Sequence, residues 1–76
     1  MPRFYFEVSR GETLKDKNDG IDLPDAHAAW IEATIACGEI IRDLDGQLRP
    51  GETWKMVVRD AEGDLYSLEF LTKQLR

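Results

Sequence analysis

The sequence has one cysteine and one histidine among its 76 residues, so two common ways of stabilising a small chain are missing. One cysteine cannot form an intramolecular disulfide, and one cysteine with one histidine cannot supply the four ligands of a structural zinc site. A domain of this length buries only about 60 % of the surface that its unfolded chain exposes, so its stability is marginal. Association with another chain is the remaining common source of stability.

Long apolar runs are also missing, since no stretch approaches the roughly 20 residues of a membrane-spanning helix. No apolar run of seven or more residues follows Arg3, so we expect no signal peptide. Basic residues are also few, since ten lysines and arginines stand against fifteen aspartates and glutamates, which gives a net charge of −5. Because nucleic-acid phosphates and anionic membranes repel an acidic domain, we predict a soluble, cytoplasmic protein that binds neither nucleic acid nor membrane.

Four segments alternate between apolar and polar residues, which is the pattern of half-buried β-strands. They cover about residues 3–9, 21–23, 53–60 and 64–71. The side chains expected on the buried face of the sheet are Phe4, Phe6, Val8, Trp54, Met56, Val58, Tyr66, Leu68 and Phe70. Pro24 ends the second segment because proline cannot donate to a strand ladder, and Gly63 completes a tight turn after Asp60. Residues 12–18 join the first two strands and can carry a few paired residues around Leu14.

One amphipathic helix is expected over about residues 26–45, with Asp25 as its N-cap and Gly46 as its C-cap. The apolar stripe that we expect to face the sheet comprises Ala26, Ala29, Trp30, Ala33, Cys37, Ile40, Ile41 and Leu44. The order of elements predicts a ββαββ fold of the α+β class. In this two-layer sandwich, one helix packs on a four-stranded, mainly antiparallel sheet with strand order 2-1-3-4. Residues 1–76 form a single domain.

The expected helix carries a second apolar stripe, formed by Ala28, Ile31, Ile35 and Gly38. The spacings of three, four and three residues are those of a heptad seam, and the two isoleucines lie about 140–180° from the centre of the main stripe. A helix on one sheet needs only one apolar face, so the second stripe predicts self-association, most simply as a homodimer. The competing interpretation is that both isoleucines are merely exposed, as many apolar side chains are.

No catalytic or metal-binding set can be assembled from the spacing of the polar residues. His27 and Cys37 are ten residues apart, about 15 Å along a helix, so they cannot form a nucleophile–base pair. Four aspartates recur at every third residue: Asp16, Asp19, Asp22 and Asp25. That spacing differs from the alternating acids of a helix–loop–helix calcium site, and we interpret the four as a solvated turn with a helix cap. We therefore predict no enzyme activity, no metal and no cofactor.

The sheet face turned away from the helix is expected to carry Tyr5, Glu7, Lys55, Val57, Arg59, Leu65, Ser67 and Glu69. Cross-strand charge pairs account for most of these residues. The functional alternative is a weak nucleotide-binding or small-ligand surface at Tyr5, Lys55 and Arg59, because an exposed aromatic ring between two bases can stack on a nucleotide. The acids Glu7 and Glu69 weaken this alternative.

Three pieces of sequence follow one another over nearly the whole chain. They are MPRFYF at 1–6, NDGIDLPD at 18–25 followed by Ala28 and Ala29, and Trp54 with VVRD at 57–60, Gly63 and Phe70. In this order and spacing, the chain resembles a family of short bacterial proteins classed as a domain of unknown function. The resemblance implies a bacterial, cytoplasmic setting and supports the fold. It transfers no catalytic residues, because the matching positions are turn glycines, a strand-ending proline, a helix cap and core aromatics.

A strand pair that ends in Leu23-Pro24-Asp25 before a helix is also similar in topology to antitoxin domains of the HicB type, which pair with a small toxin. The chain differs from that group because no DNA-binding segment follows its last strand in this sequence. Three functions remain open. The leading hypothesis is a non-enzymatic, self-associating interaction module, and the alternatives are an antitoxin-like or regulatory partner of another small protein and a weak nucleotide or small-ligand binder.

Overall fold

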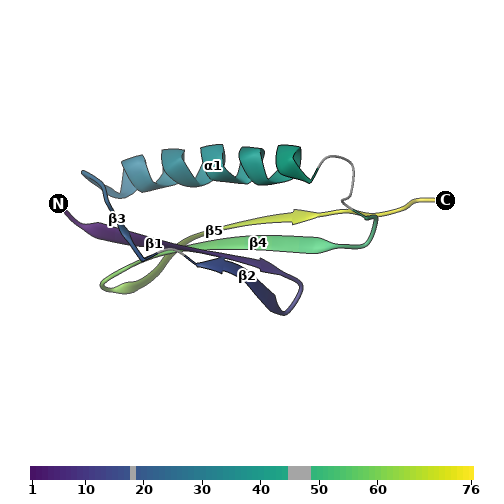
Figure 1. Cartoon of the computed structure of the whole chain (residues 1–76), viewed down its shortest axis with the longest axis horizontal. Helices are drawn as coiled ribbons and strands as arrows, with labels where there is room; N and C mark the ends of the chain where they lie inside the picture. The colour runs from purple at the N-terminus through teal and green to yellow at the C-terminus, as the bar shows by residue number, and fades with distance from the viewer. Residues whose placement is uncertain (18, 45–48) are drawn as a thin grey trace.

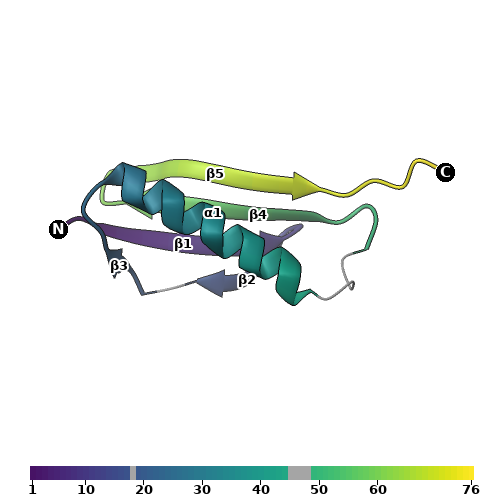
Figure 2. The same cartoon turned by 90° about the horizontal axis from the view of Figure 1, so that it is seen from above.

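The computed structural model describes residues 1–17, 19–44 and 49–76, which form two layers, with a helix lying across one face of a sheet (Figures 1 and 2). The elements in these residues are β1 (Arg3–Arg10), β2 (Thr13–Lys17), β3 (Ile21–Asp22), α1 (Ala26–Asp43), β4 (Thr53–Asp60) and β5 (Gly63–Leu71). No helix among the described residues is both long enough and apolar enough to cross a membrane.

The sheet is antiparallel throughout its described pairs and is built around β1. β4 pairs along one edge of β1, and β5 pairs with the far edge of β4. The other edge of β1 is shared, since β3 pairs with its first residues and β2 with its last. The α+β sandwich and the strand order 2-1-3-4 are therefore confirmed, with β3 as the second predicted strand. The structure adds β2, which the sequence indicates only as a few paired residues around Leu14.

Helix α1 begins where the sequence predicts. The side chain of Asp25 accepts a hydrogen bond of 2.8 Å from the backbone N–H of Ala28, as an N-cap does. The last helical residue is Asp43, and the N–H of Leu44 donates to the carbonyl of Ile40 at 3.2 Å. The predicted C-cap Gly46 lies outside the described residues.

The helix packs on the sheet through small side chains. Ala29 and Ala33 are fully buried, and Cys37 is buried with its Sγ 3.8 Å from Sδ of Met56. Burial raises the pKa of the Cys37 thiol, so at neutral pH it is protonated and packs as a small apolar group. The sheet residues buried with these three are Phe4, Phe6, Val8, Trp54, Met56 and Val58.

Two residues of the predicted core stripe are more exposed than expected. Trp30 is 38 % exposed and Ile41 is 46 % exposed. Both lie about 60–80° around the helix from Ala33, at the border of the face that touches the sheet. The ring of Trp30 packs against Tyr66 of the edge strand β5, with 5.1 Å between the ring centroids. The apolar surface of α1 therefore continues from the core onto its exposed side.

Candidate interaction surface

The second apolar stripe lies on the side of α1 that is turned away from the sheet. We call Ala28, Ile31, Ile35 and Gly38 the outer face. Ile31 is 46 % exposed, Ile35 is 53 % exposed, and Gly38 is also exposed, whereas Ala28 is partly buried. Apart from its chain neighbours and the backbone of its own helical turns, nothing described in the chain lies within 4 Å of where a Cβ on Gly38 would stand. The structure thus brings the four predicted residues together on one side of the helix, with the centre of the face uncovered.

One flank of the outer face is also largely apolar. Trp30 and Ile41, which the sequence predicts to lie in the core, border it and are exposed. Thr34 lies between them along the helix, and its hydroxyl donates to the carbonyl of Ile31 at 2.8 Å. The hydroxyl is the only hydrogen-bond donor of the Thr34 side chain, and this bond keeps it within the helix. The exposed apolar surface therefore extends from Ile35 towards Tyr66 on β5.

The open face of the sheet is occupied by charge pairs. Tyr5 lies directly opposite Arg59 in the β1–β4 register. The guanidinium of Arg59 binds Glu7 at 2.9 Å and Asp64 at 2.7 Å. The hydrogen bond to Asp64 and the charge of Glu7 together raise the pKa of Arg59. These contacts match the cross-strand pairs expected for this face.

The three residues of the predicted ligand surface are only partly brought together. Lys55 is four positions from Arg59, about 13 Å along β4, and it lies 3.7 Å from Glu69. Tyr5 is half-buried, and Gly20 packs so closely on it that an added Cβ would stand 2.9 Å from Tyr5 Cε1. Tyr5 and Arg59 are therefore neighbours, while Lys55 lies apart with its own acidic partner.

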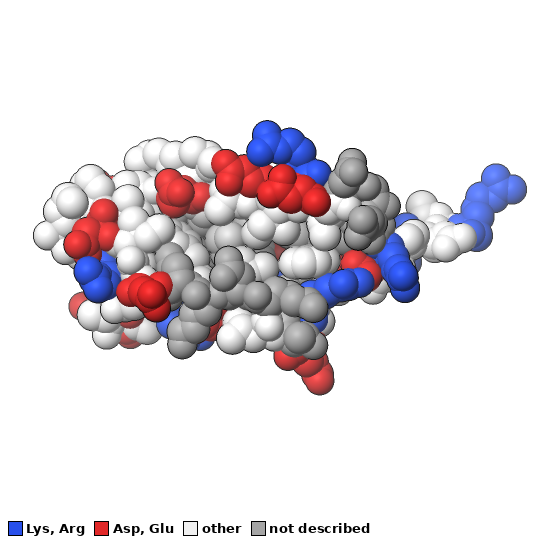
Figure 3. Space-filling view, in the orientation of Figure 1, with Lys and Arg blue, Asp and Glu red and all other residues white. Residues whose placement is uncertain are grey.

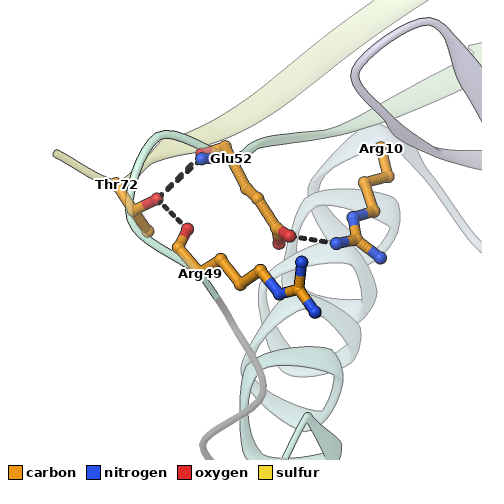
Figure 4. Close-up of polar contacts among 4 residues, drawn as sticks. All are labelled: Arg10, Arg49, Glu52 and Thr72. Atoms are coloured by element: carbon orange, nitrogen blue, oxygen red, sulfur yellow. Dashed lines mark hydrogen bonds and ion pairs between the residues drawn. The ribbon is translucent and has the colours of Figure 1, made fainter.

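A polar network that the sequence did not predict joins the loop before β4 to the end of β5 (Figure 4). The Thr72 hydroxyl accepts from the backbone N–H of Glu52 at 3.0 Å and donates to the carbonyl of Arg49 at 2.7 Å. The Glu52 carboxylate binds the guanidinium of Arg10, which also lies over the Trp54 ring at 5.9 Å. Thr72 is 20 positions and Arg10 is 42 positions from Glu52, so no local sequence pattern predicts the network. The Thr72 hydroxyl and the Glu52 carboxylate both have partners within the network, which indicates a structural role.

The Glu52 carboxylate is largely buried, with its side chain 14 % exposed. Burial acts to raise the pKa of Glu52, but hydrogen bonds from the Arg10 side chain and the Arg49 backbone outweigh it. The Trp54 indole lies near enough to lower this pKa further, although its buried N–H completes no hydrogen bond of normal geometry among the described residues. The pKa of Glu52 is therefore below the usual range for glutamate.

Glu52→Gln is expected to destabilise the protein at about pH 7 and to have much less effect at about pH 3. The folded state holds Glu52 ionised at pH values where an unfolded chain protonates it. Its stabilising contribution is therefore complete above the ordinary glutamate pKa and is lost as the pH falls through the folded pKa. Urea unfolding at both pH values measures this difference. Glu62→Gln in the exposed β4–β5 turn is the control, and an equal loss for Glu52→Gln at both pH values would contradict the assignment.

The aspartates, His27 and Cys37, which the sequence offers as possible metal ligands or catalytic groups, do not form a site in the part of the chain that the structure describes. Asp25 caps α1, and Asp22 binds Arg3 at 3.1 Å, a hydrogen bond that lowers the pKa of Asp22. Asp19 is exposed, and the side chain of Asp16 lies outside the described residues. His27 is exposed in the first turn of α1, whereas Cys37 is buried under the helix. Within the described ranges, no three His, Cys, Asp or Glu side chains gather as metal ligands.

Comparison with known families places the chain in a family of unknown function. A family model described as a domain of unknown function (DUF6894) matches residues 3–72, which include every strand and the helix. No curated protein and no solved structure matches the chain. The family match confirms the resemblance seen in the three sequence pieces.

Proposed function

Because the chain belongs to this family of unknown function, DUF6894, we propose its role from the surface that it exposes. We propose a non-enzymatic interaction module that self-associates as a dimer through the outer face of α1. The observation that carries this proposal is the exposure of Ile31 and Ile35. They are neighbours one turn apart on a helix that already buries its opposite side against the sheet.

The outer face has the symmetry that a two-fold dimer requires. Its four positions are symmetric about Ala33 in both spacing and size, with small residues at the ends and isoleucines in the middle. An antiparallel pair of helices centred there places Ala28 opposite Gly38 of the second copy, and Ile31 opposite its Ile35. A two-fold interface needs one surface patch that is complementary to itself. The small end residues allow the two helices to approach closely, while the isoleucines fill the centre.

The expected dimer is weak. Full burial of an isoleucine contributes about 1.5–3 kcal/mol, and each of these side chains has already lost roughly half of its exposure in the single chain. Association must also offset the loss of translational and rotational freedom, about 4 kcal/mol or more. Each copy carries a net charge of −5, which opposes pairing. Added salt screens this repulsion, so we expect salt to strengthen the dimer.

Size-exclusion chromatography with light scattering, at high micromolar concentration, tests the proposal. We expect the mass of two chains for the wild type and of one chain for Ile31→Glu/Ile35→Glu, because four added charges would face one another in the dimer. Ala61→Glu/Ser67→Glu adds the same charge at exposed positions away from α1, and it is expected to remain dimeric. Circular dichroism confirms that each variant is folded. A wild-type mass of one chain, or an unchanged mass for the helix variant, would overturn the proposal.

A further inference from the structure

A groove of about 260 Å³ lies between α1 and the β1 side of the sheet. It forms because α1 crosses the sheet obliquely and leaves part of β1 beside β3 uncovered (Figure 2). Its apolar lining consists of Phe6, Val8, Ile21, Ala36, Ile40 and Met56. The volume is below the roughly 300–1,000 Å³ of small-molecule sites. It suits one or two aliphatic side chains better than a small-molecule ligand.

One rim of the groove is acidic. Glu32, Glu39 and Asp43 line it from a single flank of α1, and Figure 3 shows acidic side chains gathered along the helix. Asp43 lies 3.9 Å from the exposed Arg42. Neither Glu32 nor Glu39 forms an ion pair with any side chain that the structure describes. The groove therefore combines an apolar floor with negative charge that the described side chains around it leave largely unbalanced.

Residues 73–76 combine an apolar side chain with positive charge, which is complementary to the apolar floor and acidic rim of the groove. Beyond Thr72 the backbone runs away from the body of the protein (Figures 1 and 2). Leu75 is 84 % exposed and lies between the exposed bases Lys73 and Arg76. We propose that this tail, residues 73–76, binds in the groove of a second copy of the chain. Leu75 covers the apolar floor, and Lys73 and Arg76 pair with the acidic rim.

The tail cannot readily fill the groove of its own chain. Thr72 is held to Arg49 and Glu52 beside β4, and Leu75 is only three residues further, a reach of about 10 Å. Two strand spacings, again about 10 Å, separate β5 from β1. The groove opens on the flank of α1 that faces β1, so the path must also pass a helix about 10 Å wide. A second copy is the occupant that can reach it.

This contact goes beyond the proposed function because it uses different residues. None of the outer-face residues lines the groove, so either interface can fail while the other stands. The two also respond to salt in opposite directions. Tail binding joins opposite charges, so added salt weakens it, whereas outer-face pairing is expected to strengthen.

Titration of ¹⁵N-labelled full-length protein with a synthetic peptide of residues 70–76 tests the proposal by NMR. We expect saturable shifts at the amides of Val8, Ala36 and Ile40, and weaker binding as salt is added. A peptide with Lys73→Glu/Arg76→Glu is expected to bind about tenfold more weakly, because it loses the two exposed ion pairs and adds repulsion. A Leu75→Ala peptide tests the apolar contact and is expected to bind several-fold more weakly.

Glu32→Gln/Glu39→Gln in the protein is the matched variant on the other side of the contact, and Glu62→Gln is its control. We expect the first to reduce peptide affinity severalfold and the second to leave it unchanged. Absence of groove shifts, shifts confined to the outer face, or equal binding of the charge-reversed peptide would each overturn the proposal. Measuring the mass of the wild type and of Ile31→Glu/Ile35→Glu at high salt, which weakens the tail contact, keeps the outer-face dimer separate from this proposal.

Discussion

Phe4→Ala is expected to lower the free energy of unfolding by about 3–5 kcal/mol, the usual cost of removing a buried phenylalanine ring. Phe4 is 2 % exposed and lies on β1, between the strands that flank it. The surrounding sheet cannot close around the lost ring, so a cavity remains. Small domains are stable by only about 5–15 kcal/mol, and this variant therefore loses a large part of the total. Urea unfolding followed by circular dichroism measures the loss.

Leu14→Ala is the matched control for the Phe4 variant. Leu14 is also a large apolar residue on a strand that pairs with β1, but it is 56 % exposed. We expect its truncation to change the free energy of unfolding by no more than about 0.5 kcal/mol. If the two variants were equally stable, the inner face of β1 would not be the core of the protein.

Ala33→Leu is expected to destabilise the protein by about 1–3 kcal/mol or more, although it adds apolar surface. Ala33 is fully buried at the centre of the face that α1 turns to the sheet. Its single methyl group, with that of Ala29, allows the helix to lie close to the buried strand residues. A leucine there must force the helix away from the sheet or adopt a strained rotamer. Thermal and urea unfolding at low protein concentration measure the effect.

Thr34→Leu places the same side chain one residue further along, at an exposed position. We expect it to leave stability within about 0.5 kcal/mol of the wild type. Helix propensities of alanine, leucine and threonine differ by less than about 0.7 kcal/mol, so a larger loss at Ala33 than at Thr34 reports overpacking. Equal stability of the two leucine variants would mean that the helix does not pack closely at Ala33.

The sequence predicts the features of this fold that depend on local periodicity. The alternation of apolar and polar residues predicts β1, β4 and β5. Asp25 is predictable as the N-cap because capping needs only a side-chain oxygen next to the first helical turn. β2 was not recognised as a strand, because TLKDK has no alternating apolar face. It is held by backbone pairing to the free edge of β1. Such pairing depends on where the chain returns after Gly11, which is a tertiary property.

The same distinction applies to the surfaces. The exposed positions of Ile31 and Ile35 follow from rotation about one helix, so the sequence was sufficient to predict them. The helical periodicity predicts a core stripe that is too wide, because it includes Trp30 and Ile41. The width of the buried face depends on how closely the small residues let the helix approach the sheet, which periodicity does not show. The groove beside β1 and the network at Glu52 combine residues from distant elements. Neither could be read from spacing along the chain.

Along the described chain, the hydrogen bonds of Thr72 are the last that join the C-terminal end to the body of the protein. The hydroxyl and the backbone of Thr72 both form hydrogen bonds with the segment before β4. The backbone amides of Gly51, Glu52 and Thr72 therefore exchange with solvent only when that end of the sheet opens. The residues that follow are exposed, and a protease can therefore reach the peptide bond after Lys73 without unfolding the domain. Trimming at that bond removes Leu75 while leaving the sheet and helix intact. A single cleavage would thus abolish binding through the tail without lowering the stability of the folded domain.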